Sequence, residues 1–169
     1  MPATSFFEAQ RERSKVYEMQ FGGYLRQRGY YVLPTYDYSG LGDKKAPALH
    51  GKNESLVIPD LLAWRDGRAV WFEIKLKEHA DFNRVRQHAV TGFSLRHYRH
   101  YQRVKAETAA PVYIIFVHLA EQCIKYGELD ALPISHIYDG EKMGKHGMVF
   151  FRFSDMAELM PLNQLGKAS

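Results

Sequence analysis

Three residues, Asp60, Glu73 and Lys75, have side chains that could act together on a phosphate ester. Carboxylate oxygens are ligands that Mg²⁺ accepts in proteins, and the ion keeps several waters, which leaves room for a phosphate. An ammonium group beside such an ion can orient or deprotonate the attacking water, or stabilise charge on the phosphate. These residue types therefore predict metal-assisted chemistry on a phosphate, if the fold brings them together.

Two apolar runs joined by a turn must position these residues. The runs span residues 56–64 and 69–76, and both are rich in β-branched, aromatic and aliphatic side chains, which is typical of strands. The pair Asp66-Gly67 between them is a strong signal for a two-residue hairpin turn. The segment is therefore predicted to form a β-hairpin.

The register of this hairpin determines which side chains meet. With a two-residue turn, Arg65 faces Arg68, and counting back places Asp60 opposite Glu73. Lys75 is two positions after Glu73, so both project from the same face of their strand. The sequence therefore predicts that the two carboxylates and the ammonium share one face of a sheet.

Two carboxylates that face each other need a physical reason, because like charges repel when their Cβ atoms are roughly 4.5–5.5 Å apart. A divalent cation between them is the simplest reason. The alternative is a surface hairpin on which Glu73 and Lys75 merely form an ion pair. Pro59-Asp60, on a strand that is otherwise apolar, favours the metal site.

This combination resembles the PD-(D/E)xK nuclease superfamily. The match consists of Pro59-Asp60 followed, thirteen residues after the aspartate, by Glu73-Ile74-Lys75. The resemblance implies that Asp60 and Glu73 hold one or two Mg²⁺ ions, for which Mn²⁺ can substitute, assisted by the backbone carbonyl of Ile74. It also implies that Lys75 contacts the scissile phosphate and the water that attacks it.

The segment before the hairpin resembles the opening of the archaeal Holliday-junction resolvases, which are small dimeric members of that superfamily. Glu18 is followed by Leu25, then by Gly29, and then by a strand. The resemblance implies that Glu18, on a helix expected over residues 5–28, is a further metal ligand and that the chain forms a homodimer. Weaker rivals for the role of Glu18 are Glu8 and Glu12.

A loop and a basic helix are predicted to contact nucleic acid. Residues 34–55 are rich in Gly, Lys, Ser, Asp and Pro and form the expected loop, in which Ser39-Gly40 resembles a Ser-Gly of the resolvases and Lys44 and Lys45 are basic. Loops of this length are usually functional or disordered. The sequence thus favours a flap beside the site, and the alternative is a flexible surface loop.

Residues 83–106 are predicted to form a long helix whose inward face includes Val90, Phe93 and His97. Its outer face is basic, and Arg96, Arg99 and Arg103 line one side of it as expected DNA-backbone contacts. Gln87 lies where the resemblance implies a helical glutamine near the metal. If this helix instead faces solvent or a second subunit, the loop around Lys44, Lys45 and Lys52 is the better candidate for DNA contacts.

Composition indicates one globular domain spanning residues 1–169. Apolar residues make up 46% of the chain, and no run of eighteen apolar residues could span a membrane. The N-terminus becomes charged too early for a signal peptide, and the single cysteine, Cys123, fits a reducing cytoplasm. The net charge of +4 is modest support for a polyanionic partner.

The predicted fold is α/β with a restriction-endonuclease-like core, in which helices flank a central mixed sheet of four or five strands. Residues 30–33, 112–119 and 147–153 are expected to add strands to the hairpin. The predicted function is a Mg²⁺-dependent DNA endonuclease acting as a resolvase or as a restriction or repair enzyme. The alternative is a catalytically silent nucleic-acid-binding or assembly subunit that keeps the fold.

Overall fold

The computed structural model describes residues 6–35, 47–140 and 147–167. Within these ranges the helices are α1 (Phe6–Gln27), α2 (Leu95–Thr108) and the short 3-10 helices η2 (Phe153–Asp155) and η3 (Leu162–Lys167). None of the described helices is both long and apolar enough to cross a membrane. The expected helix over residues 5–28 is confirmed as α1.

The described strands form three sheets. The largest contains, in spatial order, β1 (Tyr31–Pro34), β4 (Leu61–Arg65), β5 (Arg68–Lys77), β8 (Val112–His118), β9 (Cys123–Glu128) and β12 (Ala157–Pro161). A second sheet contains β10 (Ile134–Tyr138), β11 (Met148–Arg152), β7 (His88–Ser94) and β6 (Asp81–Asn83). The third is a two-stranded ribbon of β2 (Ala48–His50) and β3 (Ser55–Val57).

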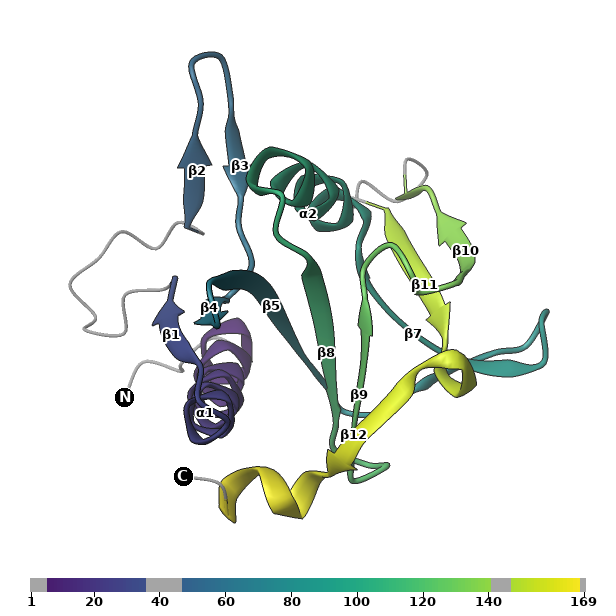
Figure 1. Ribbon diagram of the computed structural model, residues 1–169. Helices are drawn as coiled ribbons and strands as arrows, with labels where there is room; N and C mark the ends of the chain where they lie inside the picture. The colour runs from purple at the N-terminus through teal and green to yellow at the C-terminus, as the bar shows by residue number, and fades with distance from the viewer. Residues whose placement is uncertain (1–5, 36–46, 141–146, 168–169) are drawn as a thin grey trace, which may run out of the picture.

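The main sheet separates two hydrophobic cores, one on each face. Because side chains alternate along a strand, Ile74 and Ile115 pack with Phe21 of α1, whereas Ile114 packs with Tyr101 of α2. Strands β5 and β8 are parallel and the other neighbours in this sheet are antiparallel. The two long helices therefore cover opposite faces of a mixed sheet (Figure 1).

The predicted α/β fold class is confirmed, but the main sheet has six strands instead of four or five. The predicted strand over residues 147–153 corresponds to β11, which belongs to the second sheet. The additional strands of the main sheet are β9 and β12, which pair with each other across a register irregularity. Both were difficult to predict because strands this short have weak periodicity.

The predicted hairpin register is confirmed. Arg65 pairs with Arg68 across a turn in which Asp66 and Gly67 both have positive φ, of 53° and 75°. The apolar run 56–64, however, is not one strand. It divides into β3 and β4, and the chain bends at Asp60, directly before β4 begins.

The predicted helix over residues 83–106 is wrong in its first half, where the chain forms β6, a turn and β7 before α2 begins at Leu95. Val90 and Phe93 are buried as predicted, but they lie on a strand that pairs with β11 instead of on a helix. Gly92 explains part of the preference of this segment for a strand paired with β11, because a Cβ built there would lie 2.2 Å from the carbonyl oxygen of Val149. Glycine is also a poor helix former, so tertiary pairing outweighs the helical spacing.

Gly92→Ala should therefore destabilise the protein, because the methyl group meets backbone rather than a movable side chain. We expect a loss of about 1–3 kcal/mol, typical of overpacking, seen as a lower melting temperature in thermal unfolding. The matched control is Gly22→Ala in α1, where the new Cβ would meet its nearest atom, on Val32, at 3.8 Å. Since alanine favours helices over glycine by about 1 kcal/mol, this control should stabilise. A Gly92→Ala protein as stable as wild type would contradict the assigned β7–β11 approach.

Candidate active site

The structure buries three carboxylates near the end of the β4–β5 hairpin. Asp60 is 6% exposed, Glu73 is 2% exposed, and Glu18 of α1 is 7% exposed. Asp and Glu are almost never fully buried unless they are paired or bound to a cation. Burial of all three side chains therefore indicates a built site rather than a solvated surface.

Strand register places Asp60 and Glu73 next to each other. Leu61 pairs with Phe72, so one step beyond this pair places Asp60 beside Glu73. Asp60 Oδ2 accepts a hydrogen bond of 2.8 Å from the backbone N–H of Ile74. Lys75 Nζ forms an ion pair with Glu73 Oε1. The structure thus brings the three predicted residues together, as the hairpin register implied.

The electrostatics of the site disfavour three bare carboxylates. Burial raises the pKa of Asp60 well above its usual range, and the charge of Glu73 raises it further. Lys75 opposes this shift, while the charge of Glu18 adds to it. Glu18 therefore lies near enough to act on Asp60, which is the arrangement expected of a third ligand.

One oxygen of the site is left without a partner. Glu73 Oε2 is buried and has no hydrogen-bond partner among the described residues. No cluster of three or more His, Cys, Asp or Glu in the described part of the chain forms a ready-made metal cage. The donors instead fit a hard cation such as Mg²⁺, which binds through one or two carboxylates and keeps waters for the rest of its shell.

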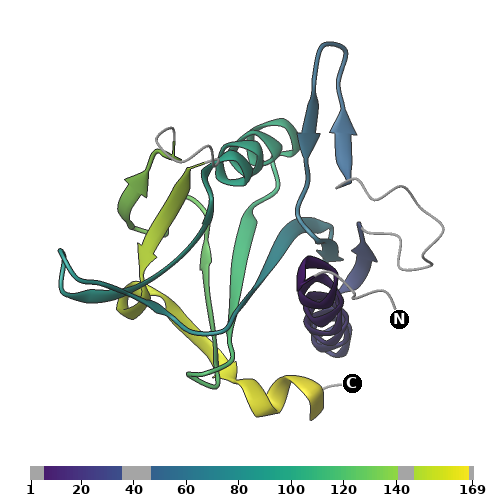
Figure 2. The ribbon, with the colours of Figure 1, turned by 180° about the vertical axis from the view of Figure 1, so that it is seen from behind.

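Two of the residues predicted at this site have other contacts. The backbone N–H of Ile74 faces Asp60, and a metal contact from its carbonyl stays a prediction. Gln87 is not on a helix: it lies in the exposed turn between β6 and β7, where its side chain donates to the carbonyl of Arg84. This turn and α1 lie at opposite sides of the molecule (Figure 1 and Figure 2). The position expected for Gln87 was wrong because the predicted helix does not begin until Leu95.

Two residues that the sequence did not assign to the site lie close to it. Burial lowers the pKa of His97 on α2, and the charge of Lys75 lowers it further while that of Glu73 opposes the shift. Burial and then the charge of Lys75 also lower the pKa of Lys77. Lys77 continues the alternation of Glu73 and Lys75 along β5. That two-residue spacing was visible in the sequence, whereas the approach of His97 depends on how α2 packs.

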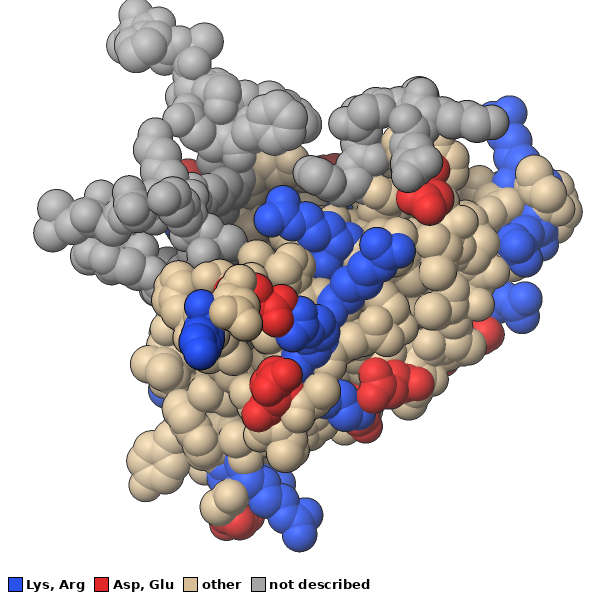
Figure 3. All heavy atoms as spheres, turned by 90° about the horizontal axis from the view of Figure 1, so that it is seen from above, with Lys and Arg blue, Asp and Glu red and all other residues tan. Residues whose placement is uncertain are grey.

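The predicted DNA-contacting residues differ in whether they form ion pairs with acidic side chains. Arg96 and Arg99 are exposed on α2 and have no ion-pair partner among the described residues. Arg103, in contrast, forms a two-pronged ion pair with Glu54 beside β3. Seen from the side on which α2 lies, Lys and Arg side chains are spread across the face with Asp and Glu side chains among them (Figure 3). Ser39, Lys44 and Lys45 lie outside the described residues.

A cavity of about 820 Å³ lies away from the carboxylates. It opens beside α1 and is lined by aromatic side chains such as Tyr24, Phe72 and Tyr113, with Arg28 and Arg68. None of the three buried carboxylates lines it. We therefore locate the site from the buried charges rather than from the size of the cavity.

Comparison with known proteins identifies the fold. No family model matches the chain, and no curated protein matches it by sequence. The Holliday junction resolvase Hjc of the archaeal hyperthermophile Archaeoglobus fulgidus aligns with a TM-score of 0.55 and 10% identity, over 91% of this chain and 96% of that one. D212, a nuclease from a fusselovirus, aligns with a TM-score of 0.41 and 14% identity over 99% of this chain and 93% of that one. The alignment with Hjc confirms the predicted resemblance at the level of the fold, which is restriction-endonuclease-like.

Asp60→Asn should stabilise the cation-free protein at neutral pH. Because the pKa of Asp60 is raised in the folded state, stability that is present below its unfolded pKa of about 3.9 is lost as the pH rises through the raised value. The amide removes this loss and can still accept the hydrogen bond from Ile74. Melting temperatures measured from about pH 4 to 8 should therefore fall less in the variant than in wild type. Added Mg²⁺ should raise the wild-type melting temperature and reduce the difference. Parallel pH profiles for the two proteins would count against this electrostatic account.

Proposed function

We propose that this protein is a Mg²⁺-dependent endonuclease that hydrolyses phosphodiester bonds in DNA. The proposal depends on one observation: Asp60 and Glu73 are buried side by side, with Lys75 paired to Glu73. Burying two adjacent carboxylates is costly unless a cation compensates their charge. The fold shared with a Holliday junction resolvase supports this assignment.

Asp60 and Glu73 would hold the ion, and Glu18 would complete the carboxylate set. When bound, Mg²⁺ supplies Lewis-acid stabilisation of charge on the phosphate and lowers the pKa of a coordinated water. The backbone N–H of Ile74 fixes the orientation of Asp60 through Oδ2. The partnerless Oε2 of Glu73 would be available to the cation.

Lys75 would act on the water or on the phosphate. Its ammonium is held at Glu73 Oε1, so it lies beside the position of the ion. From there the ammonium can orient the attacking water or stabilise negative charge on the phosphate. In its neutral form the Lys75 amine could instead accept a proton from the water. Lys77 follows two positions later on β5, and burial, then the charge of Lys75, lowers its pKa.

DNA is the proposed substrate, with four-way junctions first and restriction or repair sites closely behind. The net charge of +4 and the unmatched cations on α2 suit a polyanion. A homodimer is the proposed assembly, as the resemblance to the resolvases implies. We further propose a reducing cytoplasm, because Cys123 is a buried free thiol and the chain holds no second cysteine.

A catalytically silent nucleic-acid-binding subunit is the second candidate. The observation that favours it is that the described residues include no ready-made cluster of three metal-ligating side chains. A cleavage panel separates the two functions: four-way junction, linear duplex, single strand, flap and RNA, each with Mg²⁺, with Mn²⁺ and with chelator. Metal-dependent cleavage of any of the DNA substrates supports the enzyme. Binding without cleavage across the panel supports the silent subunit.

Asp60→Ala and Lys75→Ala should each abolish most of the metal-dependent cleavage. For Lys75→Ala we expect a fall of about 10²–10³-fold, typical for the removal of one group that stabilises the transition state. Titration calorimetry should show weaker Mg²⁺ binding for Asp60→Ala only, because Lys75 is a cation beside the ion rather than a ligand. Lys105→Ala is a suitable control, since that lysine is already paired with Glu128 and Asp130. Wild-type cleavage by either site variant would show that the roles are misassigned.

Glu18→Gln should make cleavage more dependent on metal concentration. If Glu18 is a ligand, its loss weakens ion binding, so activity should fall more at limiting than at saturating Mg²⁺. Glu12→Gln is the matched control, because Glu12 lies on the same helix but is exposed and paired with Lys15. Identical Mg²⁺ titrations for Glu18→Gln and wild type would remove Glu18 from the ligand set.

A further inference from the structure

The β6–β7 hairpin presents an exposed tip with an unusual composition. Val85 is 94% exposed and Phe82 is 61% exposed. Arg84 and Arg86, on either side of Val85, are exposed too, and neither has an ion-pair partner within the described ranges. The tip therefore combines an almost fully exposed valine with two arginines whose charges are available to an anionic partner.

The tip is held in one conformation by its own hydrogen bonds. The backbone N–H of Arg86 donates to Asn83 Oδ1 over 2.9 Å, and the Gln87 amide donates to the carbonyl of Arg84. Gln87 has a φ of 54°, a conformation that residues other than glycine adopt only when the surroundings impose it. The turn is therefore constrained, although its surface is exposed.

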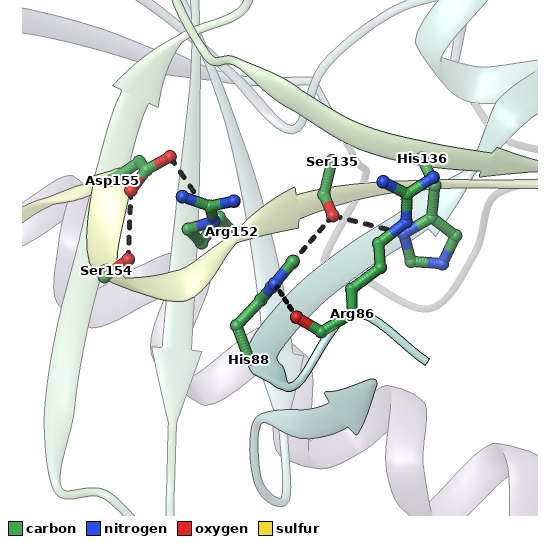
Figure 4. A network of polar contacts seen from close by, with 7 residues as sticks. All are labelled: Arg86, His88, Ser135, His136, Arg152, Ser154 and Asp155. Carbon is green, nitrogen blue, oxygen red and sulfur yellow. Dashed lines mark hydrogen bonds and ion pairs between the residues drawn. The ribbon is translucent and has the colours of Figure 1, made fainter. Parts of the chain in front are cut away.

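A chain of hydrogen bonds also ties the hairpin to β10 (Figure 4). Because the carbonyl of Arg86 can only accept, His88 Nδ1 must donate to it, over 2.9 Å. His88 Nε2 then accepts from the hydroxyl of Ser135 over 2.9 Å. Ser135 Oγ can accept from His136 Nδ1, and His136 Nε2 from the amide of Asn83, each over 3.3 Å. Each hydrogen is used once in this arrangement, so the four contacts are compatible with one another.

Packing and charge support this arrangement. The His136 ring stacks on Phe150 of β11, with centroids 4.6 Å apart and an angle of 7° between the planes. Burial lowers the pKa of His136, and the charges of Arg86 and His88 lower it further. Both rings therefore brace the hairpin against β10 through hydrogen bonds.

We propose that the β6–β7 hairpin binds the backbone of a DNA duplex to one side of the cleavage site, with Arg84 and Arg86 on phosphates and Val85 at the groove. The inference rests on the proposed nuclease function and names a feature of its substrate. A two-stranded β-ribbon fits the major groove, which is about 12 Å wide. Guanidinium groups pair with phosphate oxygens, and a preorganised ribbon loses little freedom when it binds.

The position of the hairpin limits the length of DNA it can follow. β6 begins at Asp81, soon after β5 ends at Lys77, so the hairpin is attached directly to the strand that holds Glu73 and Lys75. Val85 lies eight positions after Lys77, a reach of at most about 29 Å. At about 3.4 Å per base pair, that distance covers no more than about nine base pairs. The substrate should therefore be duplex for several base pairs on the hairpin side.

The test compares two double variants that remove the same charge. Arg84→Gln/Arg86→Gln removes the unmatched arginines. Arg152→Gln/Lys105→Gln removes cations that are already paired with Asp155 and with Glu128 and Asp130. Binding to a four-way junction and to a linear duplex is measured by fluorescence anisotropy in Ca²⁺, over a range of salt concentrations.

We expect the hairpin variant to bind several-fold more weakly at low salt, with a salt slope smaller by up to about 1.8 for two phosphate contacts. The control should keep the wild-type slope. Shortening the duplex on one side should weaken wild-type binding and leave the hairpin variant unchanged, since its contacts are already gone. Ser135→Ala, which breaks the hydrogen-bond chain but keeps both arginines, should give a smaller loss of the same kind.

Coinciding salt slopes for the hairpin variant and wild type would overturn the inference. So would a change in the oligomeric state by light scattering without a change in DNA binding, because the hairpin would then be a protein interface. Cleavage in Mg²⁺ separates this inference from the proposed function. If wild type cuts DNA while the salt slopes coincide, only the proposed hairpin contact is wrong. If wild type neither binds nor cuts DNA, both the hairpin contact and the proposed nuclease function are wrong.

Discussion

Repulsion between Asp60 and Glu73 is the constraint that the rest of the site depends on. Both carboxylates are buried at neighbouring positions, and burial and mutual repulsion raise the pKa of Asp60. The chain offers two local compensations, the N–H of Ile74 to Asp60 and the ammonium of Lys75 to Glu73. A partnerless oxygen still remains on Glu73. This unmatched oxygen is the reason a cation is proposed at the site.

Such a site needs a rigid support, which the two-sided packing of the main sheet provides. Strands β5 and β8 form its parallel centre and are buried against α1 on one face and α2 on the other. Fully burying one large apolar side chain contributes about 1.5–3 kcal/mol. Many such side chains can together offset the cost of holding a few charged groups out of water. Rigid strands also keep the side chains in place, as the proposed metal and phosphate chemistry would require.

The connection between β5 and β8 carries the second group of residues to which a function is proposed. Parallel neighbours need a crossover, and here the crossover contains β6, β7 and α2. It places His97 near Lys75 and Glu73, and it extends the β6–β7 hairpin away from α1 (Figure 2). The same length of chain that satisfies the topology therefore also carries the basic residues proposed to contact DNA.

The sequence by itself determined the β4–β5 hairpin and the meeting of its charged residues. Turn type and register depend on Asp66-Gly67 and on an alternation of two, which are properties of adjacent residues. Because these signals are local, the position of Asp60 beside Glu73 could be counted from the turn. The α/β class followed in the same way from apolar runs separated by a helix.

Only the tertiary structure decided how the remaining segments pair. Residues 88–94 form a strand because β11, more than fifty residues later, pairs with them and approaches Gly92 closely. Helical spacing in that segment could not reveal a partner so distant in the chain. The ion pair of Arg103 with Glu54 and the approach of His97 to Lys75 likewise depend on how α2 packs. Contacts between residues far apart in sequence arise from the packing of whole elements, so local pattern could not determine them.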